Sequence, residues 1–197
     1  MCGWFWTTDH HWNHKGTYQG YLDILSLLGS KDEPAVPKEE YRFPFIFNGS
    51  LSKKLQDPVS EEYFTVYLYD GIPSYTTYVN GVKKQHDHIN TYLKGRYKQD
   101  TYTNHYSTFY GSSNLGEVVY DTGNTDKPNI LVITNSYGVP INQLLTLHYG
   151  KVVTVNLKHY REDLNKDFDL GAYLDEYNIN QVLILGDICL YVYPDTF

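Results

Sequence analysis

The chain has 197 residues, with 16 Lys and Arg against 23 Asp and Glu, a formal net charge of -7, and 21 tyrosines. A chain of this length can bury a hydrophobic core. Its acidic balance, without a basic cluster, argues against nucleic acid as a ligand. No apolar run approaches the roughly 18 residues that a membrane helix needs. Cys2 and Cys189, at opposite ends, form neither a zinc-binding pair nor a disulfide framework. The excess of tyrosine suits half-buried, wet surfaces.

The N-terminal half combines an amphipathic helix with short strands. Apolar residues recur at three- and four-residue spacing from Tyr18 to Leu28, and Gly29 follows as a stop signal, so we expect a helix over 17–28. Asn80-Gly81 is the strongest short signal of a β-hairpin, which we expect within 74–85. The other expected elements are a strand at 4–6, a polar linker over 30–40, a strand over 62–69, a helix over 89–94 and a strand over 116–120.

The C-terminal third alternates buried strands with helices. Residues 129–134 form a continuous apolar run, typical of a strand that is buried on both faces. A helix is expected over 140–149, because Pro140 suits its first turn and Gly150 its end. The following elements are a strand over 151–157, a helix over 170–177 and a strand over 181–185. This β-α-β-α-β order predicts an α/β fold on a mainly parallel sheet, with ligands bound beyond the carboxyl ends of the strands.

The two halves are expected to form one domain over 1–197. In this prediction the helix over 17–28 belongs with the parallel sheet. Residues from 30 to about 125 are then an inserted, tyrosine-rich α+β region, whose rings could line a ligand-binding surface or pack a small satellite sheet.

Ser136 follows the predicted strand over 129–134 and precedes the predicted helix, with Gly138 alongside. A serine in this position would project from the carboxyl edge of the sheet, near backbone N–H groups and the positive end of a helix dipole, where an oxyanion can be stabilised. Serine in a strand-to-helix turn is more commonly a helix cap. Position alone therefore favours a cap over a nucleophile.

Residues 8–14, Thr-Asp-His-His-Trp-Asn-His, concentrate one carboxylate and three imidazoles in a short stretch. His11 and His14 would share one face of a helix that began early, which would suit a metal ion, although Asn13 argues against so early a start. Alternatively, one histidine is a general base oriented by Asp9. A polar turn without chemistry is the commonest interpretation, and the spacing leaves all three open.

Two motifs together resemble the DHHW family of bacterial proteins. The first is Thr-Asp-His-His-Trp at 8–12, which is followed by Gly-x-Tyr at the start of the predicted helix. The second is Ile-Leu-Val-Ile-Thr-Asn-Ser-Tyr at 130–137, which is followed by Pro140. The likeness extends over 153–160 and 179–185 and covers the middle only loosely. The family is similar to the SGNH hydrolase-like domains of alginate O-acetylation proteins. The resemblance therefore implies an SGNH-hydrolase-like three-layer α/β fold with a permuted motif order.

The resemblance also implies acyl transfer. Ser136 matches the serine nucleophile, His11 the general base and Asp9 its orienting acid. The implied activity is that of a serine esterase or O-acetyltransferase acting on acetyl esters of an extracellular or cell-surface polysaccharide, with no cofactor and no metal. The further oxyanion and substrate candidates are the backbone N–H groups of Ser136 and Tyr137 and the side chains of Asn114, Lys158 and Trp12.

Departures from the family pattern bear on activity. Relatives usually carry Asp where this chain has Asn135 and Asn156, and Arg where it has Lys158. Lysine is a poorer substitute for arginine where the contact is bidentate. The alternative is therefore a catalytically inactive glycan-binding or scaffold module that retains the fold. A second alternative is a metal site at His10, His11 and His14. The family implies an extracellular or membrane-anchored location and a membrane acetyl-transfer protein as partner, although no secretory signal or membrane span is expected within these 197 residues.

Overall fold

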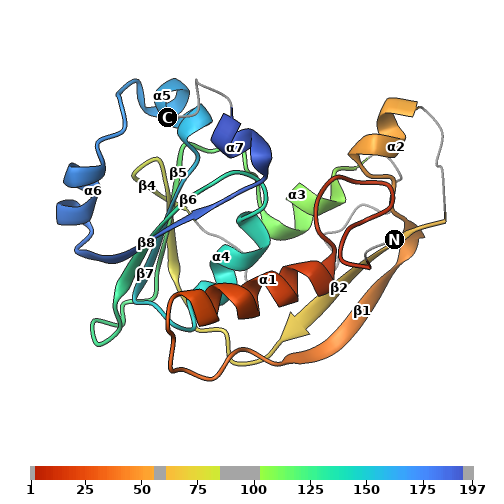
Figure 1. Ribbon diagram of the computed structural model, residues 1–197, viewed down its shortest axis with the longest axis horizontal. Helices are drawn as coiled ribbons and strands as arrows, with labels where there is room; N and C mark the ends of the chain where they lie inside the picture. Colours follow the sequence, from red (N-terminus) through yellow and green to blue (C-terminus); the bar gives the residue numbers. More distant parts are fainter. Residues whose placement is uncertain (1–2, 56–60, 85–102, 193–197) are drawn as a thin grey trace. The chain divides into compact units, whose positions relative to one another are not determined.

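The computed structural model describes three stretches of the chain, residues 3–55, 61–84 and 103–192 (Figure 1). They divide into two compact units: unit 1 takes the described parts of 1–70 and 87–111, and unit 2 those of 71–86 and 112–197. No helix within these stretches is long and apolar enough to cross a membrane.

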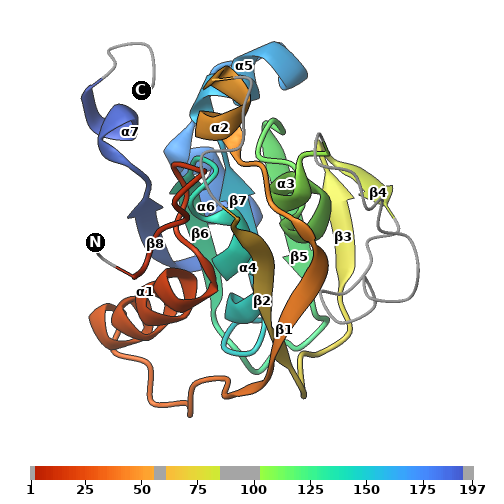
Figure 2. The same ribbon diagram turned by 90° about the vertical axis from the view of Figure 1, so that its right-hand side faces the viewer.

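Unit 1, within its described residues, combines two strands with three helices. Its elements are α1 (His14–Leu27), β1 (Pro37–Ile46), α2 (Ser50–Leu55), β2 (Tyr63–Tyr69) and α3 (His105–Tyr110). β1 and β2 pair antiparallel and lie side by side (Figure 2). Asn13 caps α1 by accepting N–H groups of its first turn, so the predicted helix is confirmed and begins earlier than expected.

An aromatic cluster forms the core of unit 1. The Phe64 ring of β2 stacks on Trp6 with centroids 5.5 Å apart and lies 5.2 Å from Phe47. Phe109 of α3 meets Phe64 edge-on at 5.8 Å. Buried rings in such arrangements dominate the energetics of a small core. The cluster joins Trp6 to the middle of the chain, so the N-terminal residues share unit 1 with part of the expected insertion. The single domain over 1–197 with an insertion from 30 to about 125 stays a prediction.

Unit 2, within its described residues, is built on a six-stranded sheet. Its strands are β3 (Thr76–Val79), β4 (Val82–Lys84), β5 (Glu117–Asp121), β6 (Asn129–Thr134), β7 (Lys151–Val155) and β8 (Ile179–Leu185). Its helices are α4 (Val139–Leu145), α5 (Leu157–Leu164), α6 (Leu170–Glu176) and α7 (Ile188–Val192). The strand order in the sheet is β4-β3-β5-β7-β6-β8.

The sheet is mixed. β6 lies parallel to both β7 and β8, which confirms the predicted parallel unit of three strands. β5 runs antiparallel to β7, β3 to β5 and β4 to β3, so the sheet is not mainly parallel as expected. Asn80 and Gly81 both have positive φ, 49° and 75°, and the tight turn that they form makes the hairpin antiparallel. That sequence signal is local and carries no information about which sheet the hairpin joins.

Helices cover both faces of this sheet and give unit 2 three layers (Figure 1). Val119, Leu131 and Val153 belong to three neighbouring strands and pack on one face with Tyr160 of α5 and Tyr173 of α6. α4 lies on the other face, and all seven of its residues are buried. The β6–α4 turn consequently lies at the carboxyl edge of the parallel strands, where α/β proteins bind ligands.

Some local predictions differ from the structure. Residues 4–6 form no strand, because the chain turns back at once and Phe5 makes an isolated bridge with Trp12. The expected strand over 151–157 ends at Val155, and α5 follows. The other differences are β1, which begins inside the expected linker over 30–40, and the helix expected over 89–94, which lies outside the described residues.

Candidate active site

Asp9 and His11 form a buried acid-base pair in the loop before α1 of unit 1. Asp9 Oδ1 lies 2.5 Å from His11 Nδ1 and also accepts the His11 backbone N–H at 3.0 Å. Because an ionised carboxylate only accepts hydrogen bonds, Nδ1 carries the proton in this contact. Nε2 is then the ring nitrogen that can take a proton from another group. With the residues 6% and 8% exposed, the pair is largely screened from water.

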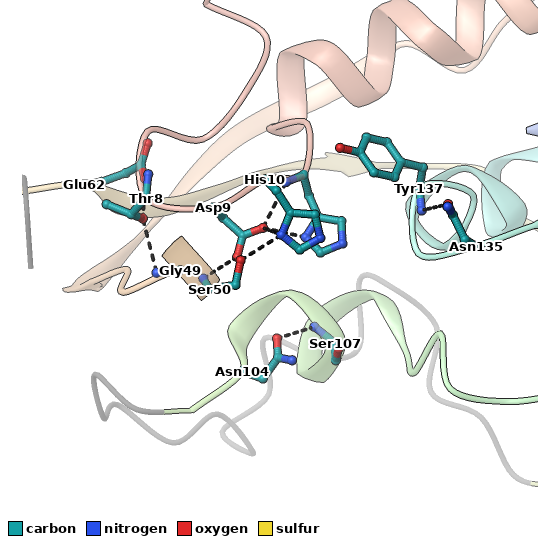
Figure 3. Close-up of polar contacts among 11 residues, drawn as sticks. Thr8, Asp9, His10, Gly49, Ser50, Glu62, Asn104, Ser107, Asn135 and Tyr137 are labelled. Atoms are coloured by element: carbon teal, nitrogen blue, oxygen red, sulfur yellow. Dashed lines mark hydrogen bonds and ion pairs between the residues drawn. The ribbon is translucent and has the colours of Figure 1, made fainter. Parts of the chain in front are cut away.

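The surroundings of Asp9 keep its carboxyl group ionised. Burial alone would raise the pKa of Asp9, because it penalises the charged form. Hydrogen bonds from the His11 imidazole, from the Ser50 N–H at 2.7 Å (Figure 3) and from the His11 N–H outweigh burial and hold the pKa of Asp9 well below its usual range. A residue that orients and stabilises a cationic imidazole must stay charged in this way.

A second carboxylate fixes the loop that carries Asp9. Glu62, just before β2, accepts the N–H groups of Thr7 at 2.8 Å and Thr8 at 2.9 Å, and the Thr8 hydroxyl at 2.6 Å. The Thr8 hydroxyl in turn accepts the Gly49 N–H at 3.2 Å (Figure 3). A Cβ on Gly49 would lie 2.4 Å from the Thr8 carbonyl oxygen, so glycine is required there. The sequence offers no local signal for Glu62, which lies 54 residues beyond Thr8.

We expect Glu62→Gln to destabilise the protein. A neutral amide has one acceptor oxygen in place of two, so the three donors lose charge assistance and at least one loses its partner. The expected loss is about 1–3 kcal/mol in the free energy of unfolding, measured by urea denaturation. Glu61→Gln is the matched control, because Glu61 is exposed, and it should change that free energy by less than about 0.5 kcal/mol. Equal stabilities of the two variants would contradict the anchoring role of Glu62.

His10 lies beside the pair but is more exposed. Its Nδ1 is 2.7 Å from the Ser50 hydroxyl oxygen and 3.6 Å from Asp9 Oδ1. Asp9, His10 and His11 offer ligand atoms within 4.8 Å of one another, which a metal ion could use. His14, grouped with them in the sequence, instead has its Nε2 3.3 Å from a carboxylate oxygen of β1. Both oxygens of Asp9 are already hydrogen bonded, so a metal ion would have to displace existing contacts.

The helix α3 supports the imidazole of His11 from one side. The Tyr106 ring, 3% exposed, stacks on His11 with centroids 4.0 Å apart and planes 12° apart. Asn104 caps α3 by accepting the Ser107 N–H at 3.1 Å (Figure 3). Stacking fixes the plane of the ring, and the contact with Asp9 fixes its rotation within that plane.

Ser136 belongs to unit 2 and lies in the turn between β6 and α4. The N-cap of α4 is Gly138, so Ser136 does not cap the helix, contrary to the commoner interpretation of its position. Asn135 holds the turn, because its Oδ1 accepts the Tyr137 N–H at 3.1 Å (Figure 3) and its Nδ2 donates to Asp187 Oδ1 at 2.9 Å. Ser136 itself is half-buried.

Close packing against the ends of β6 and β8 also fixes the β6–α4 turn. A Cβ on Gly138 would lie 2.3 Å from Thr134 Oγ1, and that hydroxyl donates to the Leu185 carbonyl oxygen at 2.6 Å. Glycine is therefore required at position 138. The ends of β6 and β8 together hold Ser136 just beyond the carboxyl end of β6.

Two candidate oxyanion groups are already engaged or solvated. The Tyr137 N–H donates to Asn135 and would have to break that bond to stabilise an oxyanion. Asn114 is exposed in the loop before β5, where its N–H donates to the Ser112 hydroxyl oxygen at 3.1 Å. The turn is formed by the Ser112 side chain, and Asn114 takes part in it only through its backbone.

The remaining candidates are Lys158 and Trp12. Lys158 is exposed on α5, one residue into that helix. Trp12, in unit 1, packs on α1, where a Cβ on Gly20 would lie 2.5 Å from its ring. The ring of Trp12 thus has a packing role in fixing the loop against the helix.

Comparisons with known proteins relate the chain to one family. A family model described as DHHW protein matches residues 3–155. No curated protein matches the chain. A DHHW family protein from Eubacterium siraeum is similar in structure, with a TM-score of 0.71 at 17% identity, covering 98% of this chain and 62% of that one. Bacillus cereus PatB1 is also similar, with a TM-score of 0.69 at 20% identity, covering 99% of this chain and 66% of that one.

A second PatB1 structure, which carries a sulfonyl adduct, matches with a TM-score of 0.69 over 98% of this chain and 64% of that one. At identities of 17% and 20% these likenesses show the fold. The chain spans less than two thirds of the length of each of these proteins.

Proposed function

Because the chain belongs to the DHHW family, we propose that it is an SGNH-like serine enzyme that transfers acyl groups, as an esterase or an O-acetyltransferase. The observation that carries the proposal is the buried Asp9–His11 pair, with Asp9 Oδ1 2.5 Å from His11 Nδ1. Nucleophilic enzymes orient a general base in this way. The sulfonyl adduct of PatB1 supports a nucleophile in a protein of this fold, since a sulfonyl group is attached through a nucleophilic atom.

In the proposed reaction Ser136 is the nucleophile. Its Oγ attacks the carbonyl carbon of an acetyl ester while His11 Nε2 takes the hydroxyl proton. The tetrahedral intermediate collapses, the bond to the alcohol oxygen breaks, and His11 returns the proton to that oxygen. Water or a sugar hydroxyl then attacks acetyl-Ser136, again with His11 as base, and releases acetate or an acetylated sugar. Asp9 holds Nδ1–H and stabilises the imidazolium in both steps.

The proposed substrate is an acetyl ester on an extracellular or cell-surface polysaccharide. Serine, histidine and aspartate supply the nucleophile, the base and the balancing charge, so the reaction needs no cofactor. If the acetyl group moves onto the glycan, a membrane protein that supplies acetyl groups is the proposed partner. The net charge of -7 does not favour nucleic acid as a substrate.

Turnover of p-nitrophenyl acetate tests the proposal. We expect release of p-nitrophenol above the buffer rate, unchanged by EDTA because no step uses a metal ion. Loss of activity in EDTA that Zn²⁺ restores would instead favour a metal centre at Asp9, His10 and His11. Absence of turnover together with saturable binding of a polysaccharide would identify a catalytically inactive glycan-binding module.

A further inference from the structure

One face of the unit 2 sheet changes from apolar to polar towards the start of β6. Core side chains of β5, β6 and β7 lie side by side on this face. Two residues away on each of these strands, Asp121, Asn129 and Lys151 share the same face, because side chains alternate along a strand. The register pairs Thr76 with Asp121, Asp121 with Lys151 and Lys151 with Asn129. These four residues therefore form a polar row across β3, β5, β7 and β6.

Two adjoining cavities lie along this polar row. One has a volume of about 450 Å³ and the other of about 410 Å³, and Tyr78 and Asp121 line both. The end of α6 contributes Glu176 and Tyr177 to the larger cavity. We call the two cavities together the Tyr78 groove. Both cavities are open to solvent, as expected of a surface along which a chain-like ligand lies rather than of a closed pocket.

The floor of the Tyr78 groove is preformed. Asn129 Oδ1 accepts the Lys151 N–H at 2.9 Å, and its Nδ2 donates to the Tyr177 carbonyl oxygen at 2.8 Å. Lys151 Nζ donates to Asp121 Oδ2 at 2.8 Å, and the two side chains remain 34% and 25% exposed. A hydrogen-bond donor and an acceptor thus stand next to each other, within reach of a ligand. Their charges offset, and the exposed Glu176 leaves the lining with a net negative charge.

Tyr78 forms the aromatic wall that the two cavities share. Its ring is half-buried and packs against the apolar cluster of the sheet. Within the described residues its hydroxyl makes no hydrogen bond, so it can serve a ligand. A sugar ring has an apolar C–H face that packs on an aromatic ring, and hydroxyl groups at its edge that need donors and acceptors.

We propose that the Tyr78 groove binds an uncharged oligosaccharide, with one sugar ring against Tyr78 and neighbouring hydroxyls hydrogen bonded to Asp121 and Lys151. The negative lining disfavours phosphates, nucleotides and polyanionic glycans. The groove lies at the start of β6 and Ser136 follows its end, so about 17 Å of strand separates them. The groove therefore binds sugar units away from Ser136, and the inference stands independently of acyl transfer.

Calorimetric titration of the Ser136→Ala protein, which cannot turn over a substrate, tests the inference. The probes are cellotetraose and chitotetraose, which are uncharged, and tetragalacturonate, which is anionic. We expect saturable binding of at least one uncharged tetrasaccharide and none of tetragalacturonate. Failure of both uncharged probes to saturate would overturn the inference. Wild-type protein should bind as tightly as Ser136→Ala, whatever the acyl-transfer assays show, so the two proposals fail separately.

Variants then locate the binding site. Tyr78→Ala should weaken binding about three- to tenfold, the usual effect of losing one aromatic contact. Tyr78→Phe keeps the ring and should bind within about twofold of the wild-type affinity. Lys151→Gln leaves Tyr78 in place but removes the charged donor, so it should weaken binding as Tyr78→Ala does. Tyr191→Ala is the control, since Tyr191 is 54% exposed on α7 and outside the groove. Wild-type affinity in both Tyr78→Ala and Lys151→Gln would overturn the inference.

Discussion

Replacing Ser136 by alanine is expected to lower kcat/KM for p-nitrophenyl acetate by at least about 10³-fold. Alanine lacks the oxygen to which the acetyl group is proposed to be attached, so no covalent intermediate forms. Because Ser136 is half-buried in a turn that Asn135 holds, the free energy of unfolding should change by less than about 0.5 kcal/mol. Both quantities can be measured on the same preparation, by spectrophotometric assay and urea denaturation.

The control for this change is Ser26→Ala, which removes an exposed hydroxyl on α1 and should keep the wild-type rate. A Ser136→Ala rate within about tenfold of wild type would show that another group carries the acyl chemistry.

Replacing Asp9 by asparagine is expected to lower kcat by about 10²–10⁴-fold, with a much smaller change in KM. The amide can donate to Nδ1, which favours the imidazole tautomer with its proton on Nε2, the atom that must act as base. It also removes the negative charge that balances the imidazolium. Asp126→Asn, at an exposed position of unit 2, is the matched control and should retain the wild-type kcat. A kcat for Asp9→Asn within about twofold of wild type would contradict the orienting role of Asp9.

The same variant has a predicted pH signature in stability. The pKa of Asp9 is lower in the folded protein than in the unfolded chain, because its hydrogen bonds outweigh burial. Its ionised form therefore stabilises the fold at pH values above the unfolded pKa of about 4, and this contribution is lost as the pH falls through the folded value. The difference in unfolding free energy between wild type and Asp9→Asn should shrink steadily as the pH falls below about 4. A difference that stays constant into acid would contradict this assignment.

The elements that the sequence predicts well depend on neighbouring residues. The strand over 129–134 matches β6 because a continuous apolar run is a local signal, and the Asn80-Gly81 hairpin matches because both residues tolerate positive φ. The Asp9–His11 pair is implied by the resemblance to the DHHW family, whereas spacing alone leaves it open beside a metal site and a polar turn. The structure shows the two residues in contact within one loop. For the strand and the hairpin, the signal that predicts the feature lies within a few neighbouring residues.

The supports of the candidate site could not be inferred in this way. Ser50 lies 41 residues from Asp9, and Glu62 lies 54 residues from Thr8 in the same loop. No short sequence motif predicts contacts over such separations. The aromatic cluster around Phe64 draws the N-terminal residues into unit 1, whereas periodicity alone grouped them with the parallel strands. The mixed sheet has a similar cause, because β5 pairs with β7 and β3 pairs with β5 over long stretches of sequence, which local patterns do not predict.

Labelling with a serine-directed sulfonyl fluoride, followed by peptide mapping, tests whether Ser136 is a nucleophile that Asp9 and His11 activate. This mechanism predicts one modified site at Ser136, no labelling there in Ser136→Ala, and slower labelling in Asp9→Asn, because the nucleophile depends on a correctly oriented base. A modification that maps to another residue, or a Ser136→Ala protein that is labelled as fast as wild type, would contradict it.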